Sequence, residues 1–161
     1  MNITLITVGR IKEKYLQDAI AEYSKRLSKY CTLSIIECPD EPTKENASDT
    51  QIQTVLEKEG ERILQKIPQD KDVYITALAI NGKQYDSPAL SDHMQDLMLR
   101  GNSHLVYIIG GSWGLSPAVL ARANEKLSFS KLTFPHQLMR VILLEQIYRC
   151  FRIMKHEPYH K

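Results

Sequence analysis

The chain opens with hydrophobic and polar residues in period two and then changes to a helical period. Residues 2–8 alternate and end at Gly9, which is typical of a half-buried strand. Between residues 14 and 30 the apolar positions recur every three or four residues, which predicts a helix with one face on the core. Residues 32–38 are predicted to form the second strand, which ends at Pro39. The chain therefore begins as a strand, a helix and a strand.

An exposed loop and a long helix are predicted next. Residues 39–46 combine Pro, Asp, Glu, Lys and Asn without periodicity, which indicates a loop on the surface. Ser48 and Gln51 match a capping box, in which the hydroxyl and the side-chain amide each satisfy a backbone amide at a helix start. We expect the helix to run over residues 49–67 and to end before Pro68.

The middle of the chain is predicted to contribute a third strand, a helix and a fourth strand. Residues 72–80 are rich in Val, Ile, Tyr and Thr, and Asn81-Gly82 behind them predicts a turn. Ser87-Pro88 supplies an N-cap and a first-turn proline for a helix that Gly101 ends. Residues 104–109 are nearly all apolar, as expected of a parallel strand that is buried on both faces.

A short helix, a fifth strand and a terminal helix complete the pattern. Ser116-Pro117 begins a helix to about residue 124, and residues 126–130 form the strand. Pro135 opens the last helix and leaves Phe134, a poor cap, in the preceding position. A nearby hydroxyl or a ligand is expected to satisfy this helix start. The candidate hydroxyls are those of Ser128, Ser130 and Thr133.

The alternation of strands and helices predicts the fold class. It indicates an α/β protein with a parallel-dominated sheet flanked by helices, formed as a single domain over residues 1–161. In such sheets, ligands bind in a crevice at the carboxyl ends of the strands. The loops around residues 110–116 and 128–135 both fall at such ends.

Composition narrows the function class. The chain is 43% hydrophobic and 25% charged, has no apolar run long enough for a membrane span, and carries no recognisable leader, so we expect a cytoplasmic protein without membrane contact. Its three cysteines lack CxxC spacing, which predicts reduced thiols and no metal site. The net charge of +2 is too small for the whole surface to bind nucleic acid, so the distribution of charge matters more.

Basic residues gather in the last helix and tail. Arg140, Arg149 and Arg152 are candidates to neutralise phosphates, with Arg149 and Arg152 on one helix face and Arg140 roughly opposite. A solvated helix end explains the same charges without a ligand.

Two further features suggest chemistry. Gly110–Gly114 lets backbone amides approach a ligand, although it is neither a dinucleotide nor an ATP fingerprint and also suits a tight strand-to-helix turn. His136 and His160 are candidates for proton transfer at neutral pH, with Tyr159 as a weaker donor or acceptor. Each of these side chains also has a merely structural interpretation.

Taken together, these segments resemble the ribosomal RNA large subunit methyltransferase H family of the SPOUT superfamily. The similarity spans the chain, and the long motifs at 109–114 and 127–137 are highly specific as a pair. The segments that carry it are Ile-Thr-Val-Gly at 6–9, Tyr-Ile-Thr-Ala-Leu at 74–78, Ile-Gly-Gly-Ser-Trp-Gly at 109–114, Leu-Ser-Phe-Ser-Lys-Leu-Thr-Phe-Pro-His-Gln at 127–137, and the terminal Glu-Pro-Tyr-His-Lys.

The resemblance implies a C-terminal trefoil knot that holds S-adenosylmethionine, and a homodimer in which each subunit completes the other's active site. It also implies methylation of N3 of a pseudouridine in 23S large-subunit ribosomal RNA of the assembled ribosome. By position, the expected cofactor contacts are Leu78, Gly110, Phe129, Ser130, Lys131, Leu132, Thr133 and Phe134.

A mechanistic hypothesis follows from this resemblance. Either His136 or His160, with Tyr159, would take up the N3 proton. The RNA phosphates would be held by Arg140, Arg149, Arg152 and Lys161. The alternatives are a non-catalytic, ribosome-associated RNA-binding protein, which needs no nucleoside pocket, and a nucleotide-dependent enzyme of doubly wound fold.

Overall fold

Five strands and five helices alternate along the chain, as the sequence predicts. The computed structural model describes residues 1–161. The strands are β1 (Asn2–Val8), β2 (Thr32–Cys38), β3 (Val73–Gln84), β4 (His104–Ile109) and β5 (Glu125–Ser128). The helices are α1 (Lys14–Leu27), α2 (Asp49–Lys66), α3 (Ser87–Leu99), α4 (Pro117–Arg122) and α5 (His136–Met154).

The strands form one parallel sheet in the order β2-β1-β4-β3-β5. Strand β4 pairs with β1 and β3, and all six of its residues are buried. The predicted α/β class with a parallel sheet is therefore confirmed. The strand order is consistent with the knotted C-terminal region that the resemblance implies.

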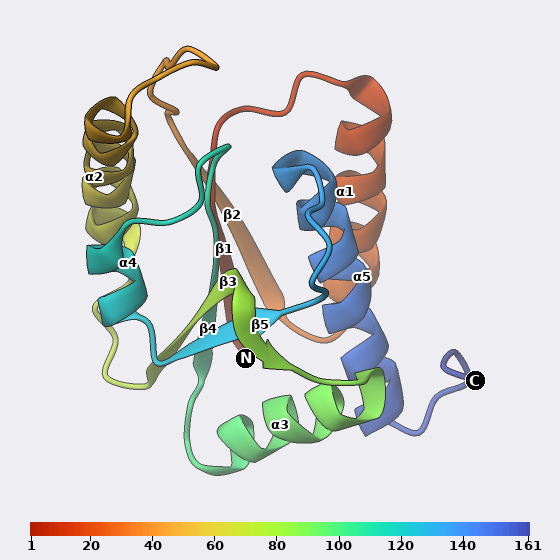
Figure 1. Ribbon diagram of the computed structural model, residues 1–161. Coiled ribbons are helices and arrows are strands. Elements are labelled where there is room, and N and C mark those ends of the chain that lie inside the picture. The colour runs from red at the N-terminus through yellow and green to blue at the C-terminus, as the bar shows by residue number, and fades with distance from the viewer.

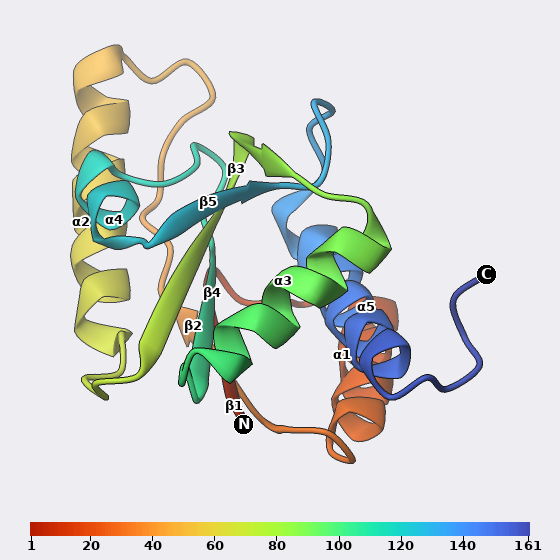
Figure 2. The same ribbon diagram turned by 90° about the horizontal axis from the view of Figure 1, so that it is seen from below.

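Helices cover both faces of the sheet and make three layers (Figures 1 and 2). Helices α1, α3 and α5 lie on one face, and α2 and α4 lie on the other. Because side chains alternate along a strand, Leu105 and Tyr107 of β4 join the core under α5, whereas Val106 and Ile108 join the core under α2. The two faces of one central strand thus serve two separate hydrophobic cores.

The predicted turn at Asn81-Gly82 is wrong, because β3 continues through both residues to Gln84. The backbone of β5 packs so closely that a Cβ on Gly82 would lie 2.7 Å from the carbonyl carbon of Lys126. The pairing with β5 shifts register between Leu78 and Lys83, so the intervening residues bulge and the strand resumes. Long-range pairing outweighs the local turn preference.

The N-caps of the helices agree with the predicted ones in two helices and differ in two others. The capping box at the start of α2 and the Ser116 cap of α4 are both present. Asp86, and not Ser87, caps α3, since its carboxylate accepts from the amide of Ala89. Pro135 is itself the N-cap of α5, one position later than predicted.

Other bounds differ by a few residues. Helices α1, α2 and α4 end at residues 27, 66 and 122, earlier than predicted, and β5 spans residues 125–128. At these three ends the amide of the C-cap residue, Ser28, Ile67 or Ala123, donates to a carbonyl of the last helical turn, and a periodic pattern does not locate this residue.

The structure also bears on membrane, thiol and metal chemistry. No helix combines the length and the apolar character that crossing a bilayer requires. Cys31, Cys38 and Cys150 are free thiols, and burial raises the pKa of each. No three acidic, histidine or cysteine side chains gather as a metal site.

We predict that Gly82→Ala destabilises the protein by about 1–3 kcal/mol, because the new methyl group must displace the backbone of β5. The measurement is urea unfolding at fixed protein concentration. Asn81→Ala, at an exposed neighbouring position, is the control and should change the free energy of unfolding little. Equal midpoints for Gly82→Ala and the wild type would contradict this account of β3.

Candidate active site

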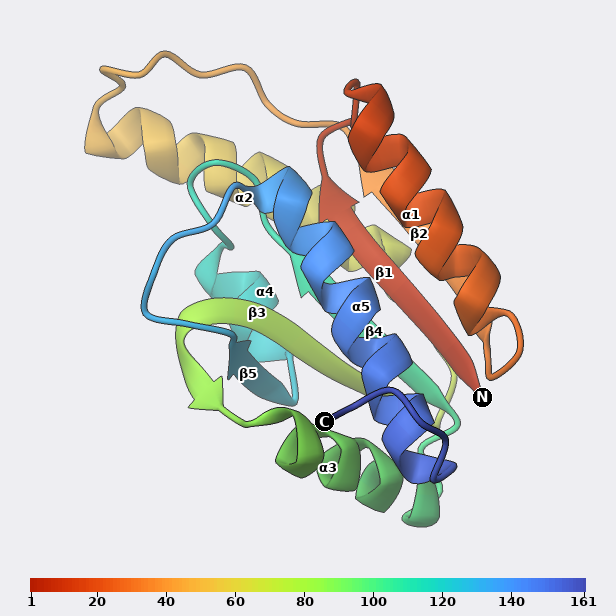
Figure 3. The same ribbon diagram turned by 90° about the vertical axis from the view of Figure 1, so that its right-hand side faces the viewer.

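A cavity of about 830 Å³ lies at the carboxyl edge of the sheet. Its walls are the loop after β4, the loop between β5 and α5, and the bulged segment of β3. Figure 3 shows these two loops approaching the first turn of α5. The volume is within the range of roughly 300–1,000 Å³ that is usual for small-molecule sites.

The loop after β4 is built from glycine because its backbone doubles back on itself. A Cβ on Gly110 would lie 2.4 Å from the carbonyl oxygen of Gly114. Gly114 has a φ of 89° and donates its amide to the carbonyl of Gly111 at 3.1 Å. The loop presents Trp113 at the cavity, with 36% of this residue exposed. Backbone atoms therefore form much of this wall.

The loop before α5 uses its own hydroxyls to hold its shape. Ser128 Oγ donates to the carbonyl of Ser130 at 3.1 Å, and Ser130 Oγ accepts from the amide of Leu132 at 3.0 Å. The N-cap Pro135 makes no side-chain cap bond. The first amides of α5 thus lack an intrahelical or side-chain acceptor beside the cavity, which favours an anionic group there.

His136, the first residue of α5, lines this cavity. Burial lowers the pKa of its imidazole below the usual value, and the nearby charge of Arg140 lowers it further. The ring is therefore neutral at neutral pH and can accept a proton.

Arg140 is buried, with 1% of its surface exposed, and does not face the cavity. Its guanidinium donates to Glu37 Oε2 at 2.8 Å and to the carbonyls of Val8 and Gly9 at 2.8 and 2.9 Å. Burial lowers the pKa of Arg140, and the Glu37 carboxylate opposes that shift. The side chain ties α5 to the ends of β1 and β2, so it is not available to an RNA phosphate.

The other predicted basic residues lie on the outer side of α5 and on the tail. Arg149 Nη2 pairs with Glu145 Oε1 at 2.6 Å, and Tyr159 donates its hydroxyl to the same oxygen at 3.0 Å. Burial and this hydrogen bond raise the pKa of Tyr159 to about 12, so its phenol stays protonated. Lys161 is exposed at the chain end.

The structure does not bring the two candidate histidines together. His160 lines a second cavity of about 570 Å³, which shares only the wall Leu127, Ser128 and Phe129 with the first. Its ring Nδ1 lies 3.3 Å from Arg149 Nη1. Within one chain, His136 and His160 therefore address different spaces.

The cavity brings together most of the residues expected to contact a cofactor. Seven of them line it, whereas Lys131 is exposed and does not. The seven are Leu78, Gly110, Phe129, Ser130, Leu132, Thr133 and Phe134.

Sequence reasoning missed five further lining residues, Ala79, Ile80, Asn81, Leu120 and Met139. Asn81 was expected to form a turn, and Ala79 and Ile80 were expected only to belong to the third strand. Leu120 and Met139 carry only the signal of ordinary apolar helix positions.

Comparisons with known proteins agree with this geometry. A family model described as "Predicted SPOUT methyltransferase" matches residues 1–160. The proteins named "Ribosomal RNA large subunit methyltransferase H" from Bifidobacterium adolescentis and Clostridium acetobutylicum are 61% and 58% identical over 161 residues, covering all of both chains.

A solved structure supports the fold alone. It is described as "a probable methylase family protein from Haemophilus influenzae Rd KW20" and matches with a TM-score of 0.51 and 10% identity, covering 99% of this chain and 70% of that one. The family model over residues 1–160 and the identity to the curated relatives show that the chain belongs to the ribosomal RNA large subunit methyltransferase H family of SPOUT methyltransferases.

Proposed function

We propose that the protein is an S-adenosylmethionine-dependent methyltransferase that modifies N3 of a pseudouridine in 23S large-subunit ribosomal RNA. The assembled ribosome in the cytoplasm is its substrate. The observation that carries this proposal is the 830 Å³ cavity whose walls are the two motifs most characteristic of the family. The names of the full-length relatives support the choice of large-subunit ribosomal RNA.

The residues of the cavity fit the methyl donor. Trp113, Phe129 and Phe134 supply aromatic surface for an adenine ring. The uncapped amides at the start of α5 suit a carboxylate. No arginine lines the cavity, and Arg140, the arginine of α5 nearest to His136, is buried and turned away, so no guanidinium repels a sulfonium there.

The chain's own residues then have defined tasks. S-adenosylmethionine, when bound, supplies a methyl group on a positively charged sulfur. The backbone loops hold the reactants in line, which accounts for most of the rate in a displacement of this kind. As the bond from N3 to the methyl carbon forms, the bond from carbon to sulfur breaks and the N3 proton passes to a base. His136 is our candidate for that base, because its ring is neutral and lines the cavity.

A homodimer accounts for the separate position of the tail. Tyr159 and His160 lie outside their own subunit's 830 Å³ cavity, so we propose that they act at the cavity of the partner. Ile80, Trp113 and Leu132 line the cavity yet are 52%, 36% and 70% exposed, which suits a rim that a partner or ligand covers. Arg149 and Lys161 remain our candidates for contacts with RNA phosphates.

The alternative is an RNA-binding protein without catalysis. It would explain the basic tail, but it gives no reason for a cavity that is lined by backbone loops and a neutral histidine. Binding of S-adenosylmethionine separates the two functions.

We predict that the wild type binds S-adenosylmethionine in calorimetry and transfers a labelled methyl group to ribosomes from a strain that lacks this gene. Gly110→Ala should weaken binding at least about tenfold, because its methyl group would collide with Gly114. Ser103→Ala, at an exposed position outside the cavity, is the control and should bind as the wild type does.

Mass spectrometry of the labelled ribosomal RNA should locate the methyl group on a pseudouridine. A wild type that gives no heat with the donor would favour the non-catalytic alternative. A label on another nucleotide would refute the N3 assignment and leave the methyltransferase activity intact.

We predict that the acid limb of the single-turnover rate has its midpoint below the usual histidine pKa of about 6.5. The lowered pKa keeps His136 neutral as the pH falls, and the rate declines only when the ring is protonated. His136→Gln should slow methyl transfer about 10²- to 10⁴-fold and remove that limb.

His156→Asn is the control, since residue 156 lies outside both cavities and asparagine tolerates its φ of 53°. An unchanged acid limb in His136→Gln would rule out His136 as the base. The same experiment on His160→Asn would then decide whether the tail supplies it.

A further inference from the structure

We propose that Tyr30, Arg152 and Glu157 form a positioning network that fixes the C-terminal tail for methyl transfer, and that Arg152 is a positioning residue and not a phosphate contact. This inference rests on the proposed function, because it concerns how the tail residues Tyr159 and His160 are presented.

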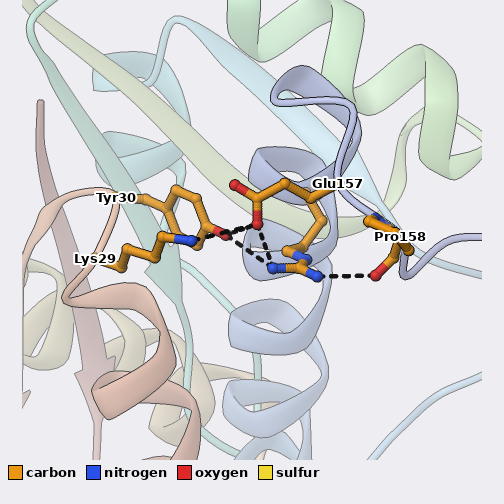
Figure 4. A network of polar contacts seen from close by, with 5 residues as sticks. Lys29, Tyr30, Glu157 and Pro158 are labelled. Carbon is orange, nitrogen blue, oxygen red and sulfur yellow. Dashed lines mark hydrogen bonds and ion pairs between the residues drawn. The ribbon is translucent and has the colours of Figure 1, made fainter.

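Glu157 is the centre of the network, which Figure 4 shows. Its Oε2 atom accepts the hydroxyl of Tyr30 at 2.7 Å and the ammonium of Lys29 at 3.4 Å. The same oxygen pairs with Arg152 Nη1. Three donors from two distant parts of the chain therefore converge on one carboxylate oxygen of Glu157, in the segment that follows α5.

The guanidinium of Arg152 holds the tail at a second point. Its Nη2 atom donates to the carbonyl of Pro158 at 2.8 Å, and Nη1 also donates to Tyr30 Oη at 3.3 Å. The side chain is only 21% exposed. Both terminal nitrogens are thus occupied within the subunit, so turning Arg152 toward an RNA phosphate would release the tail.

The surroundings keep the network in place. The ring of Tyr30 stacks on Phe151 of α5, with centroids 5.4 Å apart and an interplanar angle of 7°. The network therefore rests on the hydrophobic core, in which Phe151 is buried and against which Tyr30 packs. Lys29 is 67% exposed and adds a surface contact of the kind that contributes little.

The backbone turns back at this point. His156 adopts a φ of 53°, and the amide of Glu157 donates to the carbonyl of Arg152 at 2.9 Å. Beyond Pro158, the ring of Tyr159 packs edge-on against Tyr148 with centroids 5.0 Å apart. The tail is therefore anchored on both sides of Pro158, and these anchors set the direction in which the tail presents His160.

Arg149 provides a contrast on the same helix. Its partner Glu145 lies one turn away on α5, and its contacts with the tail are with side chains, over the ring of Tyr159 at 4.6 Å and beside His160 Nδ1 at 3.3 Å. No backbone group of the tail accepts from its guanidinium. Releasing Arg149 to a phosphate would leave the anchors at Glu157 and Pro158 in place. The two arginines therefore differ in function although they share a helix face.

The experiment measures single-turnover methylation of ribosomes at several salt concentrations. Arg152→Lys keeps the positive charge but loses the forked geometry, and Glu157→Gln loses the ion pair. We expect both to lower the rate constant about 10- to 100-fold, with the apparent ribosome affinity and its salt dependence close to those of the wild type. Tyr30→Phe should have a smaller effect in the same direction. Lys155→Gln, which removes an exposed cation next to the network, is the control and should leave the rate constant unchanged.

A second measurement does not depend on activity. In the full-length protein, backbone NMR order parameters of residues 159–161 should fall below about 0.6 in Arg152→Lys and in Glu157→Gln, and should remain high in the wild type and the control.

Two results would overturn the inference. One is an Arg152→Gln variant that keeps the wild-type rate constant while the slope of log affinity against log salt falls by about one, as expected for a lost phosphate contact. The other is a tail that becomes mobile without loss of rate. A wild type that does not methylate ribosomes would instead refute the proposed function, and this inference with it.

Discussion

The buried guanidinium of Arg140 fixes α5 to the sheet. This helix begins with His136 and leads into the tail that carries Tyr159 and His160, so it positions both groups of candidate catalytic residues. Burying a charge costs several kcal/mol unless it is paired and hydrogen bonded. Here a carboxylate and two backbone carbonyls from the ends of two strands accept from Arg140. Since these acceptors lie at the carboxyl edge of the sheet, the contact sets the first turn of the helix beside the crevice where ligands bind in such folds.

The same contact shapes the chemistry of the cavity. The charge of Arg140 disfavours protonation of His136 one turn away, in addition to the effect of burial. A neutral ring suits a site for a positively charged methyl donor, because a protonated imidazole would repel it. Arg140 thus positions α5 and also lowers the pKa of His136, although its side chain does not line the cavity.

Local patterns in the sequence were sufficient for three of the strands, whereas the expected cavity residues came from the resemblance to a known family. Strands β1, β2 and β4 have the predicted bounds, since each follows a clear period or an unbroken apolar run. Asn81-Gly82 misled because its turn preference is local, whereas its bulge arises from pairing with residues more than forty positions away. Arg140 misled for a related reason: nothing in its neighbours shows that backbone carbonyls near residue 8 will enclose it. The contact between Tyr30 and Glu157 spans 127 positions and has no sequence signal at all.

The length of α5 gives the final constraint on the site. From residue 136 to residue 149 the helix rises about 20 Å, at ~1.5 Å per residue. Arg149 lies beside His160, so the tail histidine and the cavity histidine are separated by most of a helix. One pseudouridine cannot contact both histidines of the same chain across that distance. If both histidines take part in catalysis, they must come from different subunits. The anchors at Glu157 and Pro158 then matter, because a tail that reaches the cavity of another subunit needs a fixed orientation relative to α5.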